Sequence, residues 1–138
     1  MIKALLTALA VLVSMTAFAG DVPAMSEDTL LARMASADKT MVVLDVRTPK
    51  EFAEGHVPGA INISHDQLEG RLSELDADRD RDVVVYCRSG HRAGLALGML
   101  EKAGFKRLYH LDGDYLGWTA AQRPVETAPP AAEPVPAY

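Results

Sequence analysis

The sequence predicts an α/β fold in which a parallel β-sheet is covered by helices on both faces. Two continuous runs of β-branched and apolar residues, MVVLDV (41–46) and VVVY (83–86), have the character of strands buried on both sides. Between them, DQLEGRLSEL (66–75) carries leucines at helical spacing. Strands that alternate with helices are typical of βαβ units, whose strands pair in parallel.

The remaining segments continue this alternation. Acidic residues follow Ser26, and apolar residues then recur at helical spacing, which is typical of a helix start. The further predicted elements are at most one helical turn within 47–60, a short strand at 61–64, a helix at 92–104 ending on Gly104, a third strand at 107–111 and a short helix at 115–122.

The N-terminus has the pattern of a secretory signal peptide. Lys3 supplies a positive charge, residues 4–19 carry no charge, and Ala17-Phe18-Ala19 offers small residues to signal peptidase. The uncharged stretch is shorter than the roughly 20 residues of a spanning helix, and no cysteine follows it to carry a lipid. We therefore expect cleavage after Ala19 and no membrane association of the mature chain.

The rest of the chain divides into a leader (20–25), one domain (26–126) and a tail rich in proline and alanine (127–138), which we expect to be disordered and without a catalytic part. The net charge of −5 becomes −6 when one of the 14 basic residues, Lys3, leaves with the signal peptide. This acidic balance gives no support to nucleic-acid binding or to docking on anionic lipid. Any anion site must be local.

Cys87 is the only cysteine of 138 residues. Structural cysteines of exported proteins come in pairs, so a single one is inert, intermolecular or reactive. Cys87 directly follows the strand 83–86, at the end where parallel sheets bind ligands, and we expect the site to be open to solvent. Arg88, Ser89, Gly90, His91 and Arg92 then lead into a helix. Such a loop directs backbone N–H groups inward, stabilising a thiolate and an anionic substrate beside it.

Three segments together resemble the rhodanese-like sulfurtransferases. VVLDVRTPKEFAEGHVPGAINI (42–63) is similar to the first motif of the family and CRSGHR (87–92) to its six-residue active-site loop. LDGDYLGW followed by RPVE (111–126) is similar to its closing segment. The single-domain size and the export signal further resemble the small periplasmic members.

The resemblance implies the rhodanese-like fold and a sulfur transfer through a persulfide on Cys87. The partners would be a small anionic sulfur donor, such as thiosulfate, and a nucleophilic acceptor, such as cyanide or a thiol. It also implies that the amides of residues 88–92 stabilise the anionic sulfur, that Arg88 and Arg92 contact the sulfonate, and that no metal or organic cofactor is needed.

The chain departs from the family pattern at two positions. Ala93 stands where the family often has Ser or Thr, which removes a hydroxyl near the sulfur. Asp114 stands where the family commonly has the second of two glycines. If its carboxylate faces the pocket, it would repel an anionic donor.

The other polar candidates are interpreted as support. We expect Asp45 and Arg47 to form an ion pair or hydrogen-bond network that ties loops together, and His56 to bond backbone in its turn. His91 lies inside the loop and is a candidate for substrate contact. His65 and His110 have no metal-ligand spacing, and Trp118 is expected in the core or as a pocket wall.

Other functions were weighed against sulfur transfer. A cysteine phosphatase or arsenate reductase of the Cys-x5-Arg type needs arginine six positions after the cysteine, where this chain has Ala93. A disulfide oxidoreductase needs a second cysteine. A persulfide carrier or binding module without turnover remains as the alternative. The physiological donor and acceptor and the oligomeric state stay open.

Overall fold

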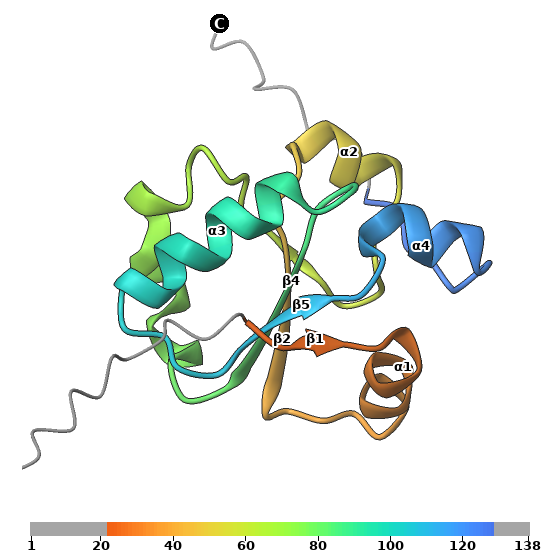
Figure 1. Cartoon of the computed structure of the whole chain (residues 1–138). Helices are drawn as coiled ribbons and strands as arrows, with labels where there is room; N and C mark the ends of the chain where they lie inside the picture. The colour runs from red at the N-terminus through yellow and green to blue at the C-terminus, as the bar shows by residue number, and fades with distance from the viewer. Residues whose placement is uncertain (1–21, 129–138) are drawn as a thin grey trace, which may run out of the picture.

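The computed structural model describes residues 22–128, so the predicted signal peptide and most of the predicted tail lie outside the described residues. Five parallel strands form one sheet in the order β1-β5-β4-β2-β3 (Figure 1). The strands are β1 (Ala24–Met25), β2 (Met41–Asp45), β3 (Ile61–Asn62), β4 (Asp82–Tyr86) and β5 (Leu108–Leu111). The predicted α/β fold with a parallel sheet is confirmed.

Helices lie on both faces of this sheet. They are α1 (Glu27–Ala35), α2 (Pro49–Glu54), the 3-10 helix η1 (Glu69–Asp78), α3 (His91–Lys102) and α4 (Asp114–Ala120). In Figure 1, α3 lies over one face, and α1 and α4 belong to the other. Within residues 22–128, none of the helices has the length and apolar character needed to cross a membrane.

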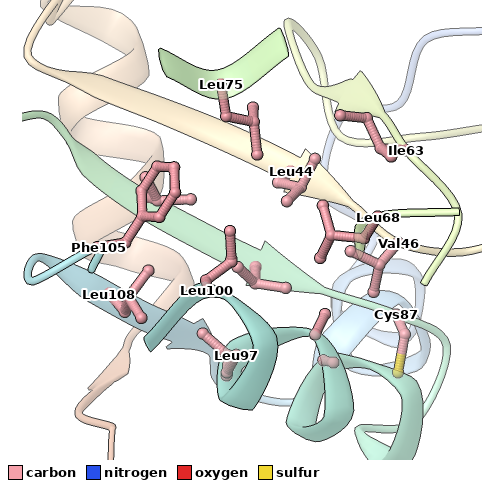
Figure 2. Packing of buried hydrophobic residues seen from close by; sticks show 14 residues of the cluster. Leu44, Val46, Ile63, Leu68, Leu75, Cys87, Leu97, Leu100, Phe105 and Leu108 are labelled. Atoms are coloured by element: carbon pink, nitrogen blue, oxygen red, sulfur yellow. The ribbon is translucent and has the colours of Figure 1, made fainter. Parts of the chain in front are cut away.

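The central strand β4 is buried along its whole length because both of its faces are covered. Val83 and Val85 belong to the core under α3, whereas Val84 and Tyr86 belong to the core under α1 and α4. This division follows from the alternation of side chains along a strand. Figure 2 shows the first of these cores, in which Leu97 and Leu100 of α3 lie against the sheet.

Strand β1 was not predicted. Its two residues fall in the segment interpreted as a leader, yet Ala24 pairs with His110 and Met25 with Leu111 of β5. Two residues are too few to show a strand pattern in sequence, and this strand forms only because an edge of β5 is available. Ser26 then caps α1 by accepting the N–H of Thr29, as expected for a helix start.

The segment 66–75 adopts a different helix type from the one its spacing suggests. The structure places a 3-10 helix at Glu69–Asp78, with no side-chain cap at its start. The predicted apolar face is nevertheless correct, since Leu68 and Leu75 are buried and Leu72 packs against the same core. Leucines three and four residues apart do not distinguish the two helix types.

Because all strands are parallel, the carboxyl ends of β2 and β4 meet at one edge of the sheet. Asp45 lies opposite Tyr86 in the register of these strands. Cys87 therefore emerges beside the segment that follows Asp45, and the functional candidates of the two segments converge there.

Leu100→Ala tests the core between α3 and the sheet. Leu100 is fully buried, so the substitution should lower the free energy of unfolding by about 2–5 kcal/mol through lost burial and a cavity. Leu95→Ala in the same helix is the matched control, because Leu95 is 46% exposed. Its unfolding free energy should stay within about 0.5 kcal/mol of the wild type. Equal losses in urea denaturation would contradict this packing.

Candidate active site

The thiol of Cys87 is buried rather than open to solvent. Only 1% of the residue is exposed, and it belongs to the core cluster that includes Val46 and Leu68 (Figure 2). Its Sγ accepts the backbone N–H of Gly90 at 3.0 Å. The expectation of an open site was wrong for the cysteine itself, because the strand end that carries it is covered by α3 on one face and by the start of α4 at the loop backbone.

Gly90 gives the loop a shape that other residues resist. Its φ of +119° lies in a region that side chains with a Cβ rarely adopt. A Cβ there would lie 3.2 Å from Oδ2 of Asp114 and 3.5 Å from Cε1 of His110. This turn directs the Gly90 N–H at the sulfur and starts α3 immediately afterwards, so the positive end of the helix dipole lies near the thiol.

The first residues of α4 form hydrogen bonds with the backbone of the loop. Tyr115 N donates to Cys87 O at 2.9 Å and Leu116 N donates to Arg88 O at 3.1 Å. Asp114 completes this clamp, since its Oδ1 accepts the Cys87 N–H at 3.0 Å. Asp114 is 4% exposed, so its carboxylate lies behind the loop rather than facing a donor.

Arg92 makes a two-bond contact with a residue that the sequence analysis did not single out. Its Nη1 and Nη2 donate to Oε1 and Oε2 of Glu51 at 2.7 and 3.0 Å. The hydrogen bond from Arg92 lowers the pKa of Glu51 to about 2, assisted by bonds from Thr48. The same pairing raises the pKa of Arg92, with smaller contributions from Cys87 and Asp45. Arg92 is thus engaged by Glu51, and its contact with a sulfonate, which the resemblance implies, stays a prediction.

The capping box at the start of α2 positions the Glu51 carboxylate. The side chain of Thr48 accepts the Glu51 N–H, and the Glu51 carboxylate accepts the Thr48 N–H. Pro49 occupies the first helical position, where its missing N–H costs nothing. The pattern T-P-K-E could therefore have predicted this helix start, but not the contact of Glu51 with a residue 41 positions later.

Arg88 is exposed and borders a cavity of about 270 Å³ beside the loop. Arg47, Glu51, Tyr115 and Leu116 also line this cavity. Among residues 22–128, Arg88 has no salt bridge, so its guanidinium is free to meet a ligand there. Ser89 and His91 are exposed as well.

Asp45 and Arg47 form a buried ion pair at the end of β2. Nη2 of Arg47 lies 2.6 Å from Oδ2 of Asp45 and donates to Gly55 O at 2.7 Å. The guanidinium also lies 4.0 Å from the ring centroid of Tyr115. The pair therefore ties β2 to the end of α2 and to α4, which is the loop-tying network predicted for these residues. A buried pair of this kind is costly to break on one side alone.

The histidines divide by role. His56 lies with Nδ1 2.7 Å from Phe52 O and its ring stacked on Phe52, so it bonds backbone in its turn. His65 has a buried Nδ1 with no hydrogen-bond partner within the described residues. His110 pairs with Asp114. Within residues 22–128, no group of three His, Cys, Asp or Glu side chains is arranged to hold a metal ion.

Ala93, a departure from the family pattern, belongs to the core. Trp118, for which the sequence offered either the core or a pocket wall, belongs to the core as well. Ala93 is fully buried, so its methyl group packs in the cluster under α3. Trp118 is also fully buried and donates Nε1–H to Pro124 O at 2.7 Å. Of the two places offered by the sequence, the core is the one observed for Trp118.

Comparison with known proteins identifies the class. The model of the rhodanese-like domain family matches residues 26–121. A sulfurtransferase of Allochromatium vinosum is 36% identical over 98 residues, which cover 71% of this chain and 89% of that protein. A thiosulfate sulfurtransferase of Azotobacter vinelandii is 29% identical over 119 residues, covering 71% of this chain and 43% of that protein.

A solved structure supports the same assignment. The rhodanese-like domain of a protein from Anabaena has a TM-score of 0.68 and 27% identity, over 84% of this chain and 87% of that one. The chain belongs to the rhodanese-like domain family, and its relatives indicate sulfur transfer as the general activity.

Gly90→Ala tests whether the loop depends on its left-handed turn. The substitution should destabilise the protein by about 1–3 kcal/mol, because the new Cβ meets Asp114 and the φ angle is unfavourable. Gly94→Ala in α3 is the matched control, since a Cβ there meets nothing within 4 Å. Gly94→Ala should raise the free energy of unfolding by roughly 0.5–1 kcal/mol, because alanine has a higher helix propensity than glycine. Chemical denaturation gives both values, and an undiminished stability of Gly90→Ala would refute the constraint.

Proposed function

We propose that this protein transfers sulfane sulfur from thiosulfate, or a similar anionic donor, to cyanide or a thiol through a persulfide on Cys87. The observation that carries the proposal is the hydrogen bond from Gly90 N–H to the only cysteine sulfur, at the start of α3. We further propose that the protein acts in the periplasm after removal of residues 1–19.

The reaction is a pair of displacements at sulfur. The Cys87 thiolate attacks the outer sulfur of thiosulfate and forms a new S–S bond, while the old S–S bond breaks and its electron pair leaves with sulfite. Cyanide then attacks the terminal sulfur of the Cys87 persulfide. Thiocyanate leaves, the thiolate returns, and the cycle involves no external oxidant or reductant.

The loop residues divide the work between the sulfur and the donor. The Gly90 N–H and the start of α3 stabilise negative charge on the thiolate and on the persulfide. Arg88 attracts the sulfonate group of the donor, a role that its exposure at the cavity supports. Arg92 is held by Glu51, so it contributes positive charge near Cys87 rather than direct donor contact. Ser89 and His91 are exposed on the loop and remain candidates for donor contact.

A phosphatase or arsenate reductase is disfavoured by the same geometry. The loop ends one residue early for the Cys-x5-Arg pattern, and Ala93, at the position where that arginine would stand, is buried in the core. A persulfide carrier that loads sulfur without turnover remains the second candidate, and it differs from the enzyme only in the second displacement.

The mass of the purified protein tests the persulfide directly. Incubation with thiosulfate should add about 32 Da, the mass of one sulfur atom, and cyanide should remove it with release of thiocyanate. Cys87→Ser should show neither step and should remain folded, because a serine oxygen can accept the Gly90 N–H in place of sulfur.

The outcomes separate the candidates. A sulfur that loads but is not released to cyanide or to a thiol would indicate a carrier. A sulfur that loads equally on Cys87→Ser would refute the mechanism, and circular dichroism of that variant shows whether its fold is intact.

Substitution of the two loop arginines separates donor contact from support. Arg88→Gln should raise KM for thiosulfate about three- to tenfold with a smaller change in kcat, because a solvent-accessible charge that attracts the donor is lost. Arg92→Gln should instead lower the free energy of unfolding by about 1 kcal/mol, since it leaves Glu51 without its arginine partner. Arg71→Gln, which removes an arginine of η1 that pairs with Glu74 and does not line the cavity, is the control for KM and should leave that value unchanged. An unchanged KM in Arg88→Gln would remove this residue from the donor site.

A further inference from the structure

An aspartate–histidine pair lies directly behind the sulfur loop. Nε2 of His110 on β5 is 2.9 Å from Oδ1 and 3.0 Å from Oδ2 of Asp114 on α4. The Asp114 side chain is 6% exposed and that of His110 is 31% exposed. The two residues are four positions apart, across the turn between β5 and α4.

This pair contacts both ends of the loop. Oδ1 of Asp114 accepts the N–H of Cys87, the residue that carries the sulfur. At the other end, Gly90 packs so closely that a Cβ on it would lie 3.2 Å from Asp114 Oδ2 and 3.9 Å from His110 Nε2. Any charge on the pair is therefore felt at the residue that becomes thiolate and persulfide.

The backbone at Asp114 indicates that the carboxylate is what matters at this position. Asp114 has a φ of +51°, a conformation that glycine adopts freely and that other residues adopt at some cost. A glycine would therefore make this turn more easily, but it would leave the Cys87 N–H without its acceptor. The aspartate keeps the left-handed turn and adds a hydrogen bond to the nucleophilic residue.

A buried carboxylate beside a sulfur nucleophile needs a compensating charge. Negative charge close to a thiol disfavours the thiolate and repels an anionic donor. The strand partners of His110 are Ala24 and Val85, which carry no charge. Glu27 of α1 points toward Gly113 and is itself paired with Arg123. Within residues 22–128, His110 is the basic side chain in contact with Asp114.

We propose that Asp114 and His110 are a pair of positioning residues for sulfur transfer. Asp114 orients the Cys87 peptide by accepting its N–H, and His110 offsets the carboxylate through the contact of its Nε2 with both carboxylate oxygens, so that negative sulfur is tolerated on the other side of the loop. The proposal rests on Cys87 being the residue that carries sulfur. It assigns a role to the position where this chain departs from the double glycine of its family.

The ionisation of Cys87 can be measured without any sulfur transfer. Because the chain has one cysteine, a cysteine label at Cβ gives one NMR signal whose shift reports the ratio of thiolate to thiol. At the pH where wild-type Cys87 is half ionised, His110→Gln should lower this ratio about three- to tenfold, since the carboxylate loses the basic side chain that contacts it. Asp114→Asn should raise it, because the amide oxygen still accepts the Cys87 N–H while the negative charge is gone.

The double variant His110→Gln/Asp114→Asn decides between charge compensation and simple packing. Under the proposal it returns the ratio to within about twofold of the wild type, since the carboxylate and the basic side chain that offsets it are removed together. If the pair were only structural, the two single variants would shift the ratio in the same direction and the double variant would be worse than either. That result, or an unchanged ratio in His110→Gln, would overturn the proposal.

Two controls keep the test sharp. Asp112→Asn removes an exposed carboxylate two residues away and should leave the ratio unchanged, because solvent screens that charge. Asp114→Gly is measured as well if Asp114→Asn does not fold, since glycine suits the positive φ; it removes the acceptor of the Cys87 N–H together with the charge, and a raised ratio in this variant still supports the effect of the charge.

Sulfur loading from thiosulfate is then measured on the same variants. Loading rates should follow the thiolate ratio, falling in His110→Gln and recovering in the double variant. If the ratio shifts as expected but wild-type protein never loads sulfur, the proposed function fails while the charge pair stands. If wild-type protein loads sulfur and the ratio does not respond, the pair fails and the function stands.

Discussion

The site depends on the hydrogen bonds between the first residues of α4 and the backbone that follows β4. Two amides of α4 donate to the carbonyls of Cys87 and Arg88, and the Asp114 carboxylate accepts the Cys87 N–H. Because the N–H and the C=O of Cys87 are both hydrogen-bonded to α4, the backbone of the loop is held in place before α3 begins. The positive φ of Gly90 then aims a backbone N–H at the sulfur. The hydrogen-bond donor is therefore in position at the sulfur before any ligand arrives.

A second set of contacts lies along the cavity beside the loop. The buried pair of Asp45 and Arg47 reaches Gly55 at the end of α2, and Glu51 of the same helix holds Arg92 across the loop. Helix α2 is short, yet it is fixed at both ends and joins the strand β2 to the start of α3. These contacts hold Arg92 in a pair with Glu51 and leave Arg88 as the loop arginine exposed at the cavity.

Sequence reasoning predicted most of the fold and singled out Cys87 as the candidate nucleophile. The valine runs of β2 and β4 and the leucines of α3 were sufficient, because burial on both faces of a sheet leaves a continuous apolar pattern. It missed β1, which is two residues long, and the helix type of η1, whose leucines suit either geometry. It wrongly expected Cys87 to be open to solvent. Burial at the end of a strand is decided by the helix that packs over it, and the local pattern does not show that packing.

The sequence by itself determined the parallel sheet, the single cysteine and the glycine loop that follows it, since these rest on local pattern and on motifs that are continuous in the chain. Only the tertiary structure decided which partners the charged residues take. Arg92 meets Glu51 from 41 positions away, and Asp114 turns toward Cys87 from 27 positions away. Such contacts depend on how parallel strands bring distant segments to one edge, and an ionisable side chain gives no sign in sequence of the partner it will face.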